Sequence, residues 1–79
     1  NYVYILQSVS HPEQFYTGLC KDVETRLAAH NAGQSPHTAK FRPWRIVSSH
    51  HFQNADTAAA LERYLKTGSG RVFAQRHLR

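Results

Sequence analysis

Residues 2–7 (YVYILQ) constrain the fold of this chain more than any other segment. Successive side chains of a β-strand point to opposite faces, so Tyr2, Tyr4 and Leu6 share one face and the residues between them share the other. This alternation is the pattern of a strand rather than of a helix. We therefore expect residues 2–7 to form a β-strand.

A second strand is expected at residues 14–19 (QFYTGL), after a turn region that contains His11 and Pro12. The short connection favours antiparallel pairing of the two strands in a hairpin. Gly18 lies near the end of the second strand, where a residue without a side chain gives the backbone conformational freedom.

A helix and a third strand are expected after the hairpin. Asp22 is a candidate N-cap, and the helix that it starts runs to about Asn31 and stops at Gly33. Residues 34–43 are polar and basic, which predicts a loop. Residues 44–52, with Ile-Val at their centre, predict the third strand.

Two more helices are expected in the rest of the chain. Asn54 or Asp56 starts the first, which ends near Gly68, and Ser69 can cap a short final helix. Together these patterns predict a single α+β domain over residues 1–79. Its three-stranded antiparallel sheet, with the third strand at an edge of the hairpin, would be flanked by two or three helices.

The charge of the chain indicates the class of its partner. Its 79 residues carry a net charge of +5, with six histidines counted as neutral. A basic surface attracts polyanions and gains free energy by releasing their counterions, so nucleic acid is the expected partner. A domain that is basic without such a partner is the alternative. No apolar run approaches the roughly 18 residues of a membrane span, so no membrane partner is expected.

Cys20 is the only cysteine, which excludes an internal disulfide and a cysteine-rich zinc site. This usage fits a reducing compartment, and we expect a cytoplasmic protein. A half-buried thiol without a chemical role is the favoured interpretation of Cys20, and a reactive thiol is the alternative.

Arg26 and His30 are four residues apart on the first predicted helix and therefore share a face. An arginine there can direct two donors onto a phosphate. A histidine one turn away can donate to a non-bridging oxygen or relay a proton. An ordinary solvated helix face is the alternative, and it is favoured if the pair is considered alone.

Tyr4 and Tyr16 come from the two hairpin strands. Cross-strand residues on one face approach to about 5 Å, so the two hydroxyls could meet near the start of the first helix. A phenol has a pKa near 10 and acts as a base only if cations or a metal lower that pKa, and Arg26, Lys21 and Lys40 could help. Two core aromatics with hydroxyls at the rim are the alternative.

Glu62 lies on the second predicted helix, between apolar Leu61 and Leu65. A surface ion pair with Lys66 at i+4 is one interpretation. A magnesium ligand is the other, since magnesium often takes only one or two protein carboxylates together with waters and substrate phosphate. With five acidic residues in the chain, one carboxylate and one metal ion is what the composition permits.

Trp44, which lies between Arg42 and Arg45 in the region of the third strand, could stack on nucleic acid while the arginines clamp the backbone. A core position for Trp44 is the stronger interpretation.

The order of these signals resembles the GIY-YIG nuclease superfamily, over roughly residues 2–75. The features are a Tyr-x-Tyr strand, then Tyr-Thr-Gly, then a helix with an arginine, a histidine one turn later and Asn-x-Gly, then a basic loop and a helix with one glutamate. The chain is most similar to the small stand-alone bacterial branch of predicted endonucleases, the URI-like domains.

The resemblance implies roles for particular residues. Val3-Tyr4 corresponds to the end of the first motif and Tyr16-Thr17-Gly18 to the second, while Arg26 and His30 correspond to the helix pair and Glu62 to the metal-binding glutamate. It also implies a three-stranded antiparallel sheet flanked by helices. The implied activity is cleavage of nucleic acid phosphodiesters with one divalent metal ion, usually Mg²⁺ or Mn²⁺.

Three positions depart from the family pattern. Tyr2 occupies the glycine position of the first motif and Thr17 the isoleucine position of the second. The late asparagine of the family has no counterpart, since no asparagine occurs after Asn54. The first two changes leave the side-chain chemistry intact, and the third puts support of the metal in doubt.

The expected function is therefore a metal-dependent endonuclease, with DNA as the favoured substrate and a homodimer or larger complex as a source of specificity. A nucleic-acid-binding module that has lost catalysis is the alternative. The expected catalytic residues are Tyr4, Tyr16, Arg26, His30 and Glu62, with Glu62 as the metal ligand. The expected nucleic-acid-binding residues are Lys21, Lys40, Arg42, Arg45, Lys66 and Arg71.

Overall fold

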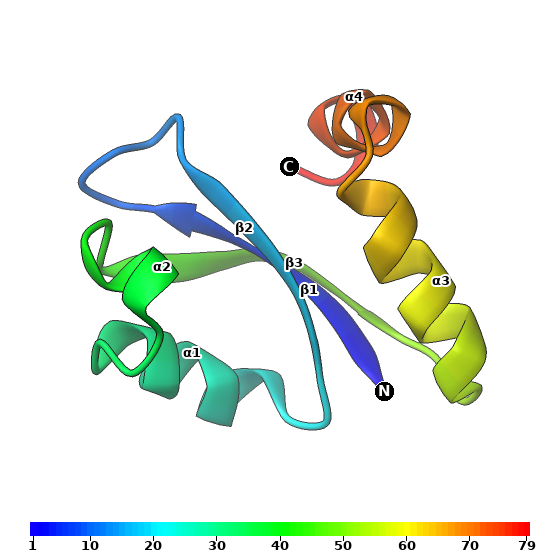
Figure 1. The fold of residues 1–79 in the computed structure, drawn as a ribbon, viewed down its shortest axis with the longest axis horizontal. Coiled ribbons are helices and arrows are strands. Elements are labelled where there is room, and N and C mark those ends of the chain that lie inside the picture. The colour runs from blue at the N-terminus through cyan, green and yellow to red at the C-terminus, as the bar shows by residue number, and fades with distance from the viewer.

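The computed structural model describes residues 1–79, which form three strands and four helices (Figure 1). In chain order the elements are β1 (Tyr2–Ser8), β2 (Phe15–Cys20), α1 (Val23–Asn31), α2 (Pro36–Ala39), β3 (Trp44–His51), α3 (Ala55–Leu65) and α4 (Gly68–His77). None of the helices combines the length and the apolar content needed to cross a membrane.

The sheet is antiparallel throughout, with strand order β2-β1-β3. The α+β class, the hairpin and the third strand at its edge are therefore confirmed. Tyr4 of the central strand pairs with Gly18 of β2 and with Ser49 of β3. The β1–β3 register shifts between Ile5 and Leu6, where β3 carries an irregularity.

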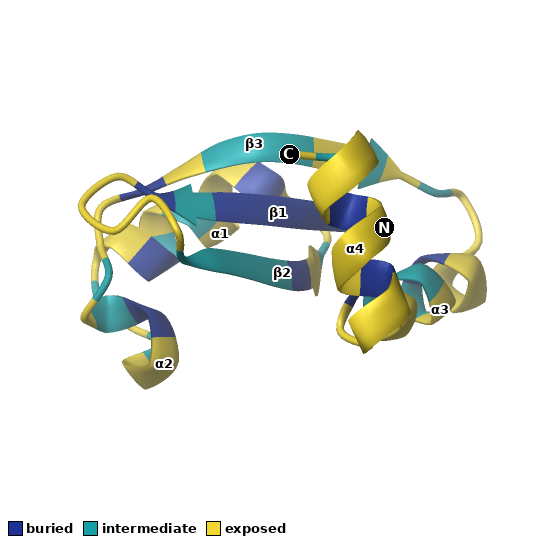
Figure 2. Ribbon diagram, turned by 90° about the horizontal axis from the view of Figure 1, so that it is seen from above, coloured by how far each residue is buried: buried dark blue, intermediate teal, exposed yellow.

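The two faces of β1 supply two separate cores, as its alternation predicted. Tyr4 and Leu6 pack with Val23 of α1 and with Trp44, on the side of α1 and α2. Val3 and Ile5 pack on the opposite side, in a cluster completed by Ala58, Leu65 and Ala74 of α3 and α4. Helices thus cover both faces of the sheet, and Figure 2 shows β1 as its most continuously buried strand.

Capping side chains fix the start of three helices. Asp22 accepts from the amide of Thr25, as expected for an N-cap. Of the two candidates at the start of α3, Asn54 is the cap. The cap of α4 is Thr67 rather than Ser69, because the Thr67 hydroxyl accepts from the Gly70 amide. Helix α4 runs from Gly68 to His77, so it is longer than the short final helix that was expected.

The segment predicted as a loop contains the short helix α2. Ser35 occupies its N-cap position, and Pro36 follows with a φ angle already suited to the first turn of a helix. This helix raises the number of helices to four. Next to it, both amide atoms of the Asn31 side chain bond the backbone of Trp44, which ties the end of α1 to β3.

Candidate active site

Tyr4 lies in the middle of the central strand and is 1% exposed. Its ring crosses over Gly18, its partner on β2, and a Cβ atom at Gly18 would overlap the phenol. The φ angle of Gly18 is not positive, since only Gly33 has that conformation among the glycines. Gly18 is therefore needed for the space that it leaves to Tyr4, and not for the backbone freedom expected from the sequence.

His30 connects Tyr4 to the short helix α2. The Tyr4 hydroxyl is 3.0 Å from His30 Nε2, and His30 Nδ1 is 2.8 Å from Thr38 Oγ1. His30 and Thr38 are 3% and 2% exposed, so both ring nitrogens are enclosed by protein. This arrangement favours orientation of Tyr4 by His30 over direct contact of His30 with a phosphate.

The direction of the hydrogen bonds follows from the Thr38 hydroxyl, which has one proton and donates it to the carbonyl oxygen of Ser35 at 3.4 Å. With this donation to Ser35, we infer that Thr38 accepts from His30, which places the imidazole proton on Nδ1. The lone pair on Nε2 consequently accepts from the hydroxyl of Tyr4.

Tyr16 forms the outer side of the same aromatic cluster. Its ring centroid is 4.8 Å from that of His30 and 6.2 Å from that of Tyr4. Tyr16 pairs with Leu6, so the two tyrosines are diagonal neighbours across the hairpin. The hydroxyl of Tyr4 bonds to His30, while Tyr16 is the more accessible tyrosine.

Arg26 is exposed on α1 and takes part in no ion pair. Burial raises the pKa of Tyr4 above its ordinary value, Tyr16 adds to this effect, and Arg26 opposes it without reversing it. Burial lowers the pKa of His30, and the charge of Arg26 lowers it further. An unpaired guanidinium therefore lies beside a neutral phenol and a neutral imidazole, an arrangement that can receive a phosphate.

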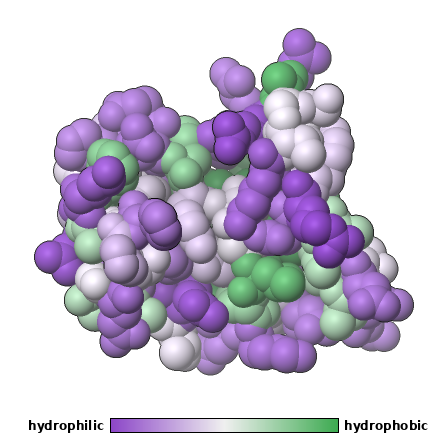
Figure 3. All heavy atoms as spheres, in the orientation of Figure 1, coloured by the Kyte–Doolittle hydropathy of each residue, from purple (hydrophilic) through white to green (hydrophobic).

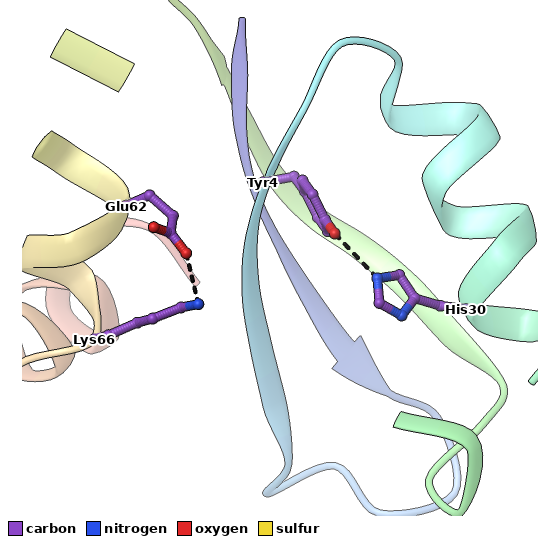
Figure 4. Close-up of polar contacts among 4 residues, drawn as sticks. All are labelled: Tyr4, His30, Glu62 and Lys66. Carbon is purple, nitrogen blue, oxygen red and sulfur yellow. Dashed lines mark hydrogen bonds and ion pairs between the residues drawn. The ribbon is translucent and has the colours of Figure 1, made fainter. Parts of the chain in front are cut away.

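Glu62 approaches from α3, on the other side of β2 (Figure 4). Its carboxylate is paired with the ammonium of Lys66 at 2.5 Å, and the two side chains are 17% and 50% exposed. The same ammonium lies 5.9 Å from the ring centroid of Tyr16, which joins this pair to the aromatic cluster. The ion pair considered as an alternative is thus present, and it lies at the edge of the site.

No group of three or more His, Cys, Asp or Glu side chains is placed to hold a metal ion. A single half-buried carboxylate that already carries a cationic partner fits an ion that keeps most of its waters and takes its other ligands from the substrate. Glu62 is the one residue of the site that could hold such an ion.

The six predicted nucleic-acid-binding residues are spread over the molecule. Lys66 and Arg71 line a cleft that also includes Tyr16. Lys21 and Arg45 lie at opposite ends of the sheet, since Cys20 pairs with the first residue of β1 and Arg45 with the penultimate one. Lys66 and Arg71 are therefore the cations best placed beside the site.

The other side of the sheet holds Lys40 and Arg42. The ammonium of Lys40 lies 5.3 Å from the ring centroid of Phe41, and the Arg42 guanidinium lies against Gly33. Trp44 is a core residue, 5% exposed, whose indole N–H donates to the carbonyl of Thr38.

Sequence reasoning missed Thr38, because it treated residues 34–43 as a loop. A signal was present in Ser35 and Pro36, which form the N-cap and first position of a helix. Thr38, inside a short helix that follows the helix carrying His30, would then have been a candidate hydrogen-bond partner for His30.

Comparison with known proteins adds a family assignment. The family model described as the GIY-YIG catalytic domain matches residues 1–76. A UPF0213 protein of Clostridium perfringens (strain 13 / Type A) is 37% identical over 67 residues, which cover 84% of this chain and 70% of that protein. A UPF0213 protein of Lactococcus lactis subsp. cremoris (strain SK11) is 33% identical over 67 residues, which cover 84% of this chain and 66% of that protein. No solved structure matches the chain significantly.

Proposed function

Since the chain belongs to the GIY-YIG catalytic-domain family, a family of nucleases, we propose that it is a divalent-metal-dependent endonuclease that hydrolyses phosphodiester bonds of DNA. One observation carries the proposal. The hydrogen-bonded pair of Tyr4 and His30 lies on one side of β2 and the carboxylate of Glu62 on the other, and the unpaired guanidinium of Arg26 is close enough to Tyr4 and His30 to lower the pKa of both. Such a set offers a group for the anionic substrate, for proton transfer and for a cation.

Tyr16 is the tyrosine that we assign to the attacking water. Tyr4 is 1% exposed and its hydroxyl donates to His30, so a water molecule reaches Tyr16 more easily. After releasing its own proton to solvent, Tyr16 would act as a phenolate and take a proton from the water as the water attacks phosphorus in line with the leaving 3′ oxygen, which solvent then protonates. Tyr4 and His30, both expected among the catalytic residues, then act as positioning residues that hold the Tyr16 ring.

Arg26 would bind the scissile phosphate from the α1 side. Its guanidinium can direct two donors onto non-bridging oxygens, and its charge is worth most when negative charge grows on the phosphorane. Because Arg26 is not engaged in an ion pair, no existing contact has to break before it binds the substrate.

A Mg²⁺ or Mn²⁺ ion held by Glu62 would neutralise charge on the scissile phosphate and on the leaving oxygen. Lys66 has to leave Glu62 for this to occur, and its ammonium then becomes free to contact a phosphate of the substrate. Lys66 and Arg71 would grip the backbone near the site, and the more distant Lys21, Lys40, Arg42 and Arg45 would extend the contact. A domain of this size has little surface for reading sequence, so a homodimer or a partner would supply specificity.

The test is the Glu62→Gln variant, assayed on labelled DNA with Mg²⁺, Mn²⁺ or EDTA. We expect metal-dependent cutting by the wild type and none by the variant, while DNA affinity is unchanged or higher because a negative charge is lost. Asp56→Asn is the matched control, since it removes one charge from an exposed position of the same helix and should leave cutting intact.

Retained cutting by Glu62→Gln would refute the assignment of the metal ligand. Tight, salt-sensitive DNA binding by a wild type that never cuts would favour the rival function, a nucleic-acid-binding module without catalysis.

A further inference from the structure

A cleft of about 430 Å³ opens between β2 and helices α3 and α4. Three cations, Lys66, Arg71 and Arg79, face one carboxylate, Glu13, along its rim. Figure 3 looks onto this face of the molecule, where purple hydrophilic side chains flank paler and green atoms. The excess of positive charge selects an anionic ligand.

Apolar side chains form part of the cleft lining. Ile5, Leu65 and Ala74 belong to the buried core, and Phe15 packs against it. A cleft with an apolar floor and a cationic rim matches a molecule that has a flat apolar part and a phosphate. A nucleotide has both parts.

The cleft is continuous with the candidate active site. Tyr16 lines the cleft and also packs against His30, and Lys66 lines the cleft and also pairs with Glu62. A strand whose scissile phosphate lies between Arg26 and Glu62 would therefore place a neighbouring nucleotide at this opening.

One face of the Phe15 ring is covered by a planar group, the guanidinium of Arg79. The guanidinium carbon of Arg79 lies 4.0 Å from the ring centroid, and the same guanidinium donates to the carbonyl of Arg71. Aromatic faces accept nucleobases in the same stacked manner, and a base that entered would displace Arg79 toward the phosphate.

We propose that this cleft is a nucleotide subsite, in which the base next to the cleaved phosphodiester stacks on Phe15 while its phosphate binds Lys66 and Arg71. The volume of the cleft suits one nucleotide, and we expect the base to be unstacked from its neighbours when it binds. The proposal rests on the proposed nuclease function for the identity of the polymer, but binding at the cleft requires neither metal nor cutting.

The test uses ¹H–¹⁵N spectra of the full chain, titrated in EDTA with deoxyadenosine 5′-monophosphate, with deoxyribose 5-phosphate and with inorganic phosphate. We expect the mononucleotide to shift the amides of Phe15, Thr17 and Ala74, and the two ligands without a base to leave these amides unchanged. Phe15→Leu keeps the apolar volume but removes the aromatic face, and it should weaken mononucleotide binding roughly 10-fold or more, as expected for loss of one stacking contact. Its affinity for inorganic phosphate should not change.

Phe73→Leu is the matched control, because Phe73 is an exposed aromatic of α4 outside the cleft lining, and it should bind the mononucleotide like the wild type. Equal affinity for the mononucleotide and for inorganic phosphate, or an unchanged affinity in Phe15→Leu, would overturn the subsite. Base-dependent binding by a protein that never cuts DNA would leave the subsite standing and refute the nuclease. Cutting of DNA without base-dependent binding would refute the subsite and leave the nuclease standing.

Discussion

Thr38 determines which nitrogen of His30 carries the proton, because its hydroxyl donates to Ser35 and accepts from Nδ1. Thr38→Val has nearly the same shape but cannot accept, so Nδ1–H would be left buried without a partner. We expect the proton to move to Nε2, with a loss of about 1–3 kcal/mol in the free energy of unfolding. The ¹⁵N shifts of the imidazole report the tautomer, and cutting should fall together with the change of tautomer.

Thr38→Ser is the control for this prediction, since it retains the hydroxyl and should retain both the tautomer and the activity. An unchanged Nδ1–H tautomer in Thr38→Val would contradict the direction assigned to the hydrogen bonds.

His30 also makes the stability depend on pH. Its pKa in the folded state is lowered by burial and by Arg26, so the unfolded chain takes up the proton more readily. The contribution is fully present above the ordinary histidine pKa near 6.5 and is lost as the pH falls below that value. Urea unfolding between pH 7.5 and 5 should show decreasing stability, with a smaller decrease in His30→Gln. Parallel profiles for the two proteins would assign the dependence to other groups.

At the residue scale, the sequence predicted which residues come together at the candidate site better than it predicted the contacts between them. The four-residue spacing was enough to place Arg26 and His30 on one helix face, because helical periodicity is local. The space that Gly18 leaves for Tyr4, and the bond between His30 and Thr38, depend on strand register and on the docking of α2, which no local pattern encodes.

At the scale of elements, the junction between α3 and α4 depends on Gly70. A Cβ atom there would overlap the carbonyl of Tyr64, which is backbone and cannot rotate away. Gly70→Ala should therefore destabilise the fold by about 1–3 kcal/mol, although alanine is the better helix former. Thermal unfolding would show this as a decrease in Tm of at least about 4 °C.

Gly68→Ala is the comparison for this prediction, because a Cβ atom two residues earlier in the same helix meets nothing within 4 Å. It should leave the Tm unchanged or raise it. Similar effects of the two substitutions would show that helix propensity, and not the close contact with α3, governs this junction.

The strands, their hairpin and the ends of most helices were predictable, because alternation and capping residues are properties of short segments. Which edge of the hairpin β3 joins was not. Asp22 and Asn54 cap as expected. The exceptions were α2, whose four residues are too few for a periodic pattern, and the start of α4, where Thr67 competes with Ser69 for the same role.

At the scale of the whole molecule, the net charge of +5 predicts affinity for nucleic acid, but its distribution predicts how that affinity responds to salt. If the cations beside the site make the phosphate contacts, Arg71→Gln should reduce the slope of log affinity against log salt by about 0.7–0.9. Arg45 lies on β3, the edge strand opposite β2, where its side chain bonds Gln7, so Arg45→Gln should change the slope less. Fluorescence anisotropy of labelled DNA at four salt concentrations measures both slopes, and equal losses would indicate a footprint along the whole sheet.

The site encloses an edge strand, with Tyr4 and His30 on one side of β2 and Glu62 on the other. If these residues form the active site, a further strand added beside β2 would cover it, whereas a strand added beyond β3 would leave it open. We therefore expect strands added to this domain by insertion, fusion or design to be tolerated beside β3 rather than beside β2.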